Sequence, residues 1–141
     1  MSQLAIIYPV FAQVALTFAL LLWLAALRTS ALNAGTVRPS EIALREQAWP
    51  ARTAQVGNCF ANQFEAPILF YVLALLVIFT RLSDVLIVAL AWVFVLLRFA
   101  HAYVHTTSNT VRVRGAIFGA GVVVLLVMWI WFAIRFLTAA V

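Results

Sequence analysis

Two groups of polar residues lie within apolar segments of this chain, each spaced so that its members share one face of a helix. The first group is Asn58, Asn62 and Glu65, at positions i, i+4 and i+7 of a segment that continues apolar to Phe79. Inside a membrane a carboxylate costs roughly 2.5–3.5 kcal/mol on insertion scales. We therefore expect Glu65 to point into a helix bundle, toward a hydrogen-bond donor or a cation.

The second group is Arg98, His101 and His105, at i, i+3 and i+7 near the end of another apolar segment. If the two segments meet, they bring an acid, a guanidinium, two imidazoles and two amides around one buried pocket. In such a pocket Glu65 would pair with Arg98 or Arg112, because each charge then offsets the desolvation of the other.

Two other interpretations of these residues stay open. One is a structural ion-pair network that only fixes how the helices pack. The other is a metal held by His101 and His105, which stand four residues apart, with Glu65 as a third ligand. A single pair of histidines at this spacing is a weak metal signal, so we predict no metal site.

Composition places the chain in a membrane. Of its 141 residues 67% are hydrophobic and only 9% are charged, which is far too little charge for a soluble domain of this size. The formal net charge is +5, and every basic side chain other than histidine is an arginine. Because the arginines stand between apolar runs, they indicate membrane topology and not binding to nucleic acid.

The apolar runs predict four membrane-spanning helices, at about 4–27, 58–80, 85–105 and 115–137. Each is long enough, at about 1.5 Å per residue, to cross a hydrocarbon core roughly 30 Å thick. We therefore predict an all-α integral membrane four-helix bundle that forms a single domain over residues 1–141. Small residues at 115, 116, 119 and 120 predict a face where helices approach closely.

The arginines predict the orientation of these spans. Seven of the nine lie on one predicted side, in or beside the loops 28–57 and 106–114; they are Arg28, Arg38, Arg45, Arg52, Arg98, Arg112 and Arg114. The positive-inside rule then places both basic loops in the cytoplasm and both termini outside. Within the first of these loops, residues 40–46 predict a short helix capped by Ser40.

Taken together, these features resemble a known family of membrane proteins. Four spans in about 140 residues, a basic first loop and the run Asn62-Gln63-Phe64-Glu65 followed by a proline are similar to the MAPEG family, the membrane-associated proteins in eicosanoid and glutathione metabolism. The resemblance implies left-handed bundles assembled as homotrimers, with glutathione bound between neighbouring subunits. It also implies a divergent bacterial member located in the inner membrane.

The family pattern in the second helix is an Arg, an Asn four residues later, a Glu three residues after that, and then a Pro. Asn62 and Glu65 match it, but Asn58 stands at the arginine position and Pro67 comes one residue early. A rival register that starts from Ala54 would place Ala61 at the glutamate position. We prefer the first register because it retains the acid.

Other family positions also fall on this chain. Arg98 matches an arginine near the end of the third helix, and His105 stands where the family has a tyrosine. Arg112 or Arg114 matches the arginine that opens the fourth helix. Arg28 matches a basic residue that ends the first helix.

The resemblance implies a glutathione-dependent transferase or peroxidase that acts on lipophilic electrophiles. Its catalytic residues would be Arg112 and Arg28, which stabilise the glutathione thiolate. The residues that bind glutathione would be Asn58, Asn62, Glu65, Arg98, His101 and His105. The expected partners are further copies of the chain, membrane lipid and a lipophilic small molecule, without nucleic acid.

The alternative function is that of a membrane scaffold or lipid-binding protein that has lost glutathione chemistry. The departures at Asn58 and His105 favour it, because they remove contacts on which the family pattern relies. An arginine binds a carboxylate with two charge-assisted hydrogen bonds, whereas asparagine offers only a neutral donor.

Overall fold

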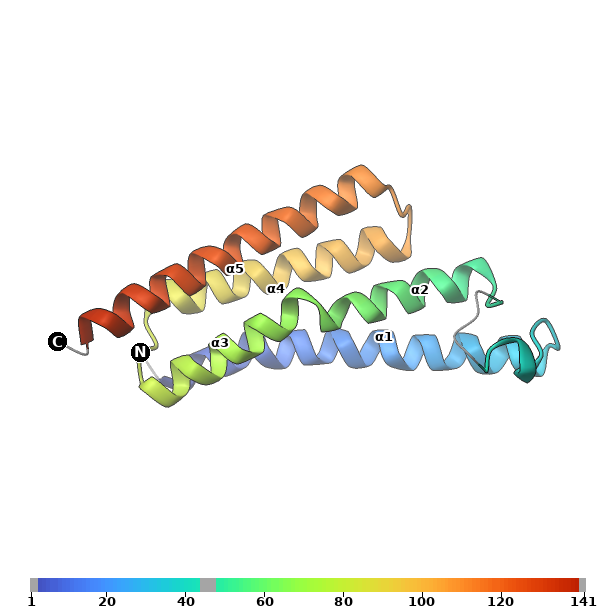
Figure 1. The fold of residues 1–141 in the computed structure, drawn as a ribbon, viewed down its shortest axis with the longest axis horizontal. Helices are drawn as coiled ribbons and strands as arrows, with labels where there is room; N and C mark the ends of the chain where they lie inside the picture. Colours follow the sequence, from blue (N-terminus) through green and yellow to red (C-terminus); the bar gives the residue numbers. More distant parts are fainter. Residues whose placement is uncertain (1–2, 44–47, 140–141) are drawn as a thin grey trace.

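The computed structural model describes residues 3–43 and 48–139, and every regular element among them is helical. The elements are η1 Gln3–Ile6, α1 Ile7–Asn33, η2 Pro39–Glu41, α2 Ala51–Ala61, η3 Asn62–Phe64, α3 Ala66–Thr80, α4 Val85–Thr106 and α5 Val111–Ala139 (Figure 1). Four helical stretches are long and apolar enough to cross a membrane. The prediction of an all-α, multi-pass membrane fold is thus confirmed.

The helices extend beyond the spans expected from hydropathy. Candidate spans cover Leu4–Asn33, Ala51–Thr80, Val85–Thr106 and Val111–Ala139. The additional turns lie mostly at the end where polar loops begin, and a helix that leaves the hydrocarbon core no longer needs apolar side chains. The second span differs most, because it begins at Ala51 and contains a break between α2 and α3.

Consecutive spans run in opposite directions, so both termini lie at one end of the bundle (Figure 1). We call this the terminal end, and the end with the α1–α2 and α4–α5 connections the loop end. Of the described arginines, only Arg81 and Arg135 belong to the terminal end. The expected segregation of positive charge is therefore present, and the side that faces the cytoplasm stays a prediction.

The apolar core is concentrated in the terminal half of the bundle. It joins Phe70, Leu73 and Val77 of α3 to Phe94 of α4 and Met128 of α5, all fully buried. The rings of Phe70 and Phe94 stack with 4.9 Å between their centroids. In lipid, apolar burial gives no hydrophobic gain, so this half is stabilised by close van der Waals packing.

Asp84 ties two helices together at the terminal end. Its Oδ1 atom accepts a 2.9 Å hydrogen bond from the Ile87 backbone and so caps α4. Its Oδ2 atom accepts a 2.8 Å hydrogen bond from the Trp131 indole of α5 and lies 3.9 Å from the Arg135 guanidinium. The start of α4 is thereby fixed to the end of α5.

One local prediction needs correction, and a second stays untested within one chain. The short helix in the first loop is the turn Pro39–Glu41, and its capping residue is Arg38 instead of Ser40, because the Arg38 backbone N–H donates to Glu41 at 2.8 Å. The predicted helix also covered residues 44–46, which lie outside the described residues. At the small-residue face of α5, a Cβ added at Gly115 or Gly119 would meet no atom of another helix within 4 Å, so the close approach of helices there stays a prediction for contacts between chains.

Candidate functional site

The site begins where the second membrane span breaks. After Ala61 the α-helix gives way to the 3-10 turn Asn62–Phe64, and Glu65 has φ −96° and ψ −106°, outside the helical region. Pro67 follows in the first turn of α3, where its missing N–H is tolerated. Inside a membrane, such irregular backbone is tolerated where protein buries it or where it lines a cavity.

The break changes the arrangement expected for the first polar group. Because the helix does not continue through Glu65, Asn58, Asn62 and Glu65 do not share one helical face as predicted. Asn62 and Glu65 line a common pocket, and Asn58 does not line it. The structure therefore separates Asn58 from the other two residues. Glu65 is exposed within one chain, as Asn58 is, so the carboxylate is less enclosed than expected.

Arg98 reaches the break from α4. Its side chain is only 2% exposed, and its Nη2 atom donates to the Asn62 carbonyl at 3.2 Å and to Asn62 Oδ1 at 2.7 Å. A cation at the carboxyl end of a helix is stabilised by the helix dipole. Arg98 thus caps α2 from a position eight residues before the end of α4, roughly 12 Å at about 1.5 Å per residue.

The Asn62 side chain stands between Arg98 and Glu65. Its amide nitrogen donates to Glu65 Oε2 at 2.6 Å while its oxygen accepts from Arg98. Among the described residues the ion pair found joins Arg135 to Asp84, and Glu65 forms none. The expected direct pairing of Glu65 with Arg98 or Arg112 is therefore replaced by a relay through a neutral amide.

The two histidines of α4 lie beside Arg98, as their spacing predicted. His101 and His105 are buried, and their rings meet edge to face with 5.4 Å between centroids. Phe118 of α5 lies 5.8 Å from the His101 ring, and the Arg98 guanidinium carbon lies 5.9 Å from the Phe118 centroid. The face formed by Arg98, His101 and His105 is thus turned toward the second and fourth spans.

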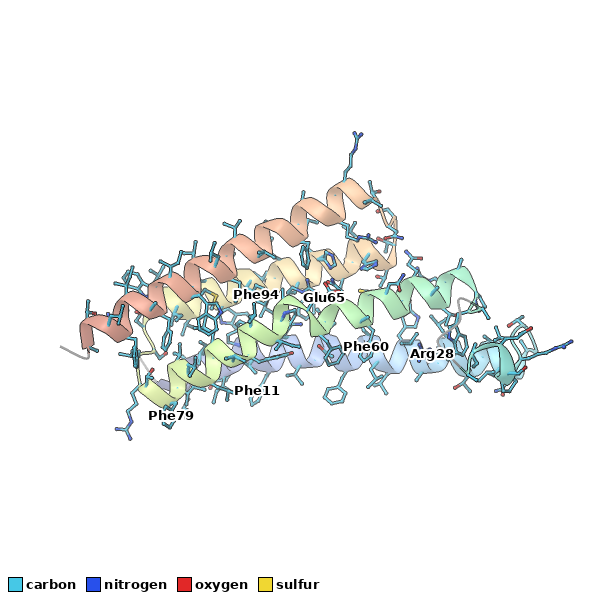
Figure 2. All side chains as sticks on the ribbon, viewed as in Figure 1. Phe11, Arg28, Phe60, Glu65, Phe79 and Phe94 are labelled. Carbon is cyan, nitrogen blue, oxygen red and sulfur yellow. The ribbon has the colours of Figure 1, made fainter. Side chains whose placement is uncertain are left out.

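These side chains surround a pocket of about 230 Å³ between the helix break, α4 and α5. The residues that line it are Asn62, Glu65, His101, His105, Arg114, Gly115 and Phe118. Figure 2 places Glu65 on the side of the second span that faces α4 and α5. The walls carry both signs of charge, hydrogen-bonding groups and one aromatic face, as a binding site for a small polar molecule requires.

The remaining predicted residues lie elsewhere in the chain. Arg112 is exposed and does not line the pocket, whereas Arg114 does, with its Nη1 atom bonded to Asn109 Oδ1 at 2.6 Å. Arg28 lines a different pocket between α1 and α2, where its guanidinium carbon lies 5.1 Å from the centre of the Trp49 ring. Within one chain, therefore, neither arginine predicted to be catalytic reaches the polar pocket.

Sequence reasoning missed a second buried polar contact. Gln13 of α1 donates to Gln63 at 3.0 Å, and Gln63 donates to the Cys59 carbonyl at 3.0 Å. Both glutamines are buried, at 0% and 1% exposure. The sequence could have indicated this contact, because Gln13 is a single amide inside an otherwise apolar run. Such a group must find a hydrogen-bond partner in the bundle.

No metal site is evident in the described part of the chain. Among residues 3–43 and 48–139, no group of three or more His, Cys, Asp or Glu side chains is placed to hold an ion. The geometry therefore gives no support to the alternative in which His101, His105 and Glu65 share a metal.

Fold and site together define a class: a multi-pass, all-helical membrane bundle with a polar pocket at a break in its second span. A comparison with protein-family models matches the MAPEG family over residues 6–134, which includes nearly all of the four spans. The chain belongs to the MAPEG family. Comparisons with curated proteins and with solved structures found no significant match.

Proposed function

We propose that this MAPEG protein binds glutathione in the polar pocket and uses it, as a transferase or peroxidase, on lipophilic electrophiles. MAPEG proteins commonly use glutathione. The observation that carries the proposal is one pocket within the membrane spans that Asn62, Glu65 and two buried histidines line, with the buried Arg98 hydrogen-bonded to Asn62 beside it. Ionisable groups inside membrane spans are costly and usually serve a function.

The residues of the pocket fit the chemistry of glutathione. His101 Nδ1 and His105 Nδ1, from two residues that line the pocket, and Nε of Arg98, which is bonded to Asn62 beside it, are buried without a hydrogen-bond partner among the described residues. Buried polar atoms are nearly always paired, so these three indicate a site designed for further polar contacts. Glutathione offers carboxylates and amides for such contacts, as well as an ammonium group that complements Glu65.

Each residue then has a role set by its position. Glu65 accepts hydrogen bonds from the ligand ammonium, while Asn62 and Arg98 hold the Glu65 carboxylate in place. Arg114, the arginine of α5 that lines the pocket, stabilises negative charge on the sulfur. When bound, glutathione supplies a nucleophilic thiolate, which attacks far better than the thiol.

The pocket also supports the proposal of a homotrimer. Its volume of about 230 Å³ is below the roughly 300–1,000 Å³ usual for small-molecule sites, and a neighbouring subunit would enlarge the site. Next to it, Gly115, Ala116 and Ala120 of α5 are exposed, and small residues let another helix approach closely. Native mass spectrometry in detergent should detect trimers; a protein that is only monomeric contradicts this part of the proposal.

The lipophilic substrate would reach the pocket from the bilayer. The outer faces of the spans carry many large apolar side chains, such as Leu96 and Leu126, that suit contact with lipid. A substrate dissolved in the hydrocarbon region can therefore approach the thiolate laterally, without crossing water.

Glutathione binding to the purified protein tests the proposal, with a matched pair of arginine variants. Arg114→Ala should weaken binding about tenfold or more, because a charge-assisted hydrogen bond contributes about 1.5–3 kcal/mol. Arg112→Ala removes the same charge from the same helix but outside the pocket, and should bind like wild type. Equal loss in both variants would mean that general charge, and not the pocket, attracts the ligand.

A second candidate function is a scaffold or lipid-binding protein without glutathione chemistry. It is favoured by Asn58, which occupies the family's arginine position and is exposed outside the pocket. If wild type fails to bind millimolar glutathione while Asn58→Arg gains binding, the family scaffold is intact and serves another ligand. If neither variant binds, glutathione is the wrong ligand for this pocket.

A further inference from the structure

The two arginines at the polar pocket are both held by asparagine side chains. Arg98 donates to Asn62 Oδ1 at 2.7 Å, and Arg114 Nη1 donates to Asn109 Oδ1 at 2.6 Å. In each case the acceptor is a neutral carboxamide oxygen. Among the described residues, neither arginine forms an ion pair with a carboxylate. Both guanidinium groups are therefore held in place without a direct negative partner.

Asn109 lies in the loop between α4 and α5, in a backbone conformation that few residue types adopt. Its φ of +49° falls in the left-handed region, where asparagine and aspartate are the side chains most readily accepted after glycine. Its backbone N–H donates to the Val104 carbonyl at 2.8 Å. The loop residue that holds Arg114 is thus itself attached to the end of α4.

The Asn109 side chain joins the end of α4 to the start of α5. Arg114, five positions later, lies in the first turns of α5, and its N–H donates to the Thr110 carbonyl at 2.9 Å. A long, half-buried arginine side chain has many rotamers, and holding one of them costs conformational entropy. The bond to Asn109 reduces this freedom before any ligand arrives.

The other polar groups of the pocket do not replace this contact. Glu65 of the second span and His101 and His105 of α4 line the pocket together with Arg114. Among the described residues, the side-chain hydrogen bond that Arg114 donates goes to Asn109 and to none of these three. Asn109 is therefore the side chain of this chain that fixes Arg114 in the pocket wall.

We propose that Asn109 is a positioning residue, whose neutral side-chain oxygen fixes Arg114 in the wall of the pocket and leaves its charge available to an anionic group. In the reaction that group is the glutathione thiolate; this part rests on the proposed function, whereas the positioning of Arg114 does not. An aspartate would accept the same hydrogen bond and the same φ, but its charge would offset that of the arginine. Asparagine combines positive φ, an acceptor and no charge.

Chemical modification with phenylglyoxal tests the positioning on full-length protein in detergent, without glutathione. Asn109→Gly accepts the positive φ and removes only the acceptor. Arg114 should then react about fivefold faster, the ratio that corresponds to one hydrogen bond of about 1 kcal/mol. Peptide mass spectrometry measures the rate at each arginine. Arg112, exposed on the same helix and outside the pocket, should react as in wild type.

Ser108→Ala is the matched control in the same loop, because the Ser108 hydroxyl contacts Thr110 and not Arg114. Both arginines should keep their wild-type rates in this variant. The positioning role is overturned if Arg114 reacts equally fast in wild type and in Asn109→Gly. It is also overturned if Arg112 accelerates together with Arg114, because the loop as a whole has then loosened.

The ultraviolet absorption of the glutathione thiolate, titrated with pH on the bound ligand, tests the need for a neutral oxygen. At a pH below the titration midpoint, Asn109→Asp should lower the ratio of thiolate to thiol about tenfold, since the added carboxylate offsets the charge on Arg114. Asn109→Gly should lower it less, because that charge remains. An aspartate variant that ionises glutathione as wild type does would overturn this role. If wild type binds no glutathione, the proposed function fails, and the phenylglyoxal rates alone decide whether Asn109 positions Arg114.

Discussion

The Arg98 guanidinium donates a 2.7 Å hydrogen bond to the side-chain oxygen of Asn62, 36 positions earlier in the chain. The other end of the same amide donates to Glu65 at 2.6 Å. A neutral group therefore separates the buried cation from the carboxylate, and no contact ion pair forms between them. Glu65 keeps one oxygen that this amide does not use, and its carboxylate stays available to a ligand in the pocket.

The relay predicts that Asn62 is important for stability. Asn62→Ala removes both side-chain hydrogen bonds and leaves Arg98 underpaired, so we expect a loss of about 2–3 kcal/mol in the free energy of unfolding. The matched change Asn58→Ala affects an exposed amide four residues earlier and should stay within about 0.5 kcal/mol. Thermal unfolding in detergent measures both; similar curves for the two variants would contradict the relay.

The buried glutamine pair predicts strong coupling between two spans. Gln13→Leu or Gln63→Leu alone leaves a buried amide without its partner, which should cost about 1–3 kcal/mol. The double variant removes both amides and should be closer to wild type than the sum of the single changes. A double-mutant cycle by denaturant unfolding measures this coupling, and simple additivity would mean that the contact is unimportant.

The contact between Asp84 and Trp131 predicts a graded loss of stability at the terminal end. Trp131→Phe removes one hydrogen bond, for about 0.5–1.5 kcal/mol. Asp84→Ala removes that bond and also the cap of α4, so its unfolding midpoint should fall further. Thermal unfolding would disprove this role if Asp84→Ala were as stable as Trp131→Phe. Glutathione binding should not change in either variant, since both residues lie far along the spans from the pocket.

Antiparallel spans predict that both loops face one side of the membrane. Cysteines introduced at Ser40 and Ser108, both exposed, should react with a membrane-impermeant thiol reagent from the cytoplasmic side only. Ser40 is a better site than the nearby Gly35, whose φ of +67° disfavours a side chain. Cys59 is buried and should give little background. Labelling of both positions from outside would reverse the orientation, and labelling from opposite sides would rule out the four-span arrangement.

The elements of this fold were predictable because hydropathy and arginine placement act over whole segments. Four spans follow from residue type, and the meeting of Asn62 and Glu65 with Arg98, His101 and His105 follows from the depth at which the antiparallel spans place them. The rotation of each helix about its axis does not follow. Arg112 and Arg114 differ by about 200° around α5, so packing alone decides that Arg114 faces the pocket.

The break in the second span was the main structural feature that hydropathy could not reveal. Pro67 was the one sequence feature that indicated the break. A proline in the first turn of a new helix cannot be distinguished, from the sequence, from a proline that is tolerated within a continuous helix. The position of Arg28 was equally inaccessible, because it depends on how α1 packs against α2 and Trp49.

The break also bears on how the chain is inserted during synthesis. A poorly paired backbone carbonyl in hydrocarbon is costly, and within its own span the Asn62 carbonyl accepts only a long 3.5 Å hydrogen bond from the Glu65 N–H, whereas its side-chain donor, Arg98, lies on the following span. The Asn62 carbonyl and the Arg98 guanidinium therefore each lack a good hydrogen-bond partner until both spans are present. The link of residues 81–84 between α3 and α4 is short enough for the two spans to leave the translocation machinery as one hairpin. We therefore expect the second and third spans to enter the membrane together, with the guanidinium and the broken helix shielding each other from lipid.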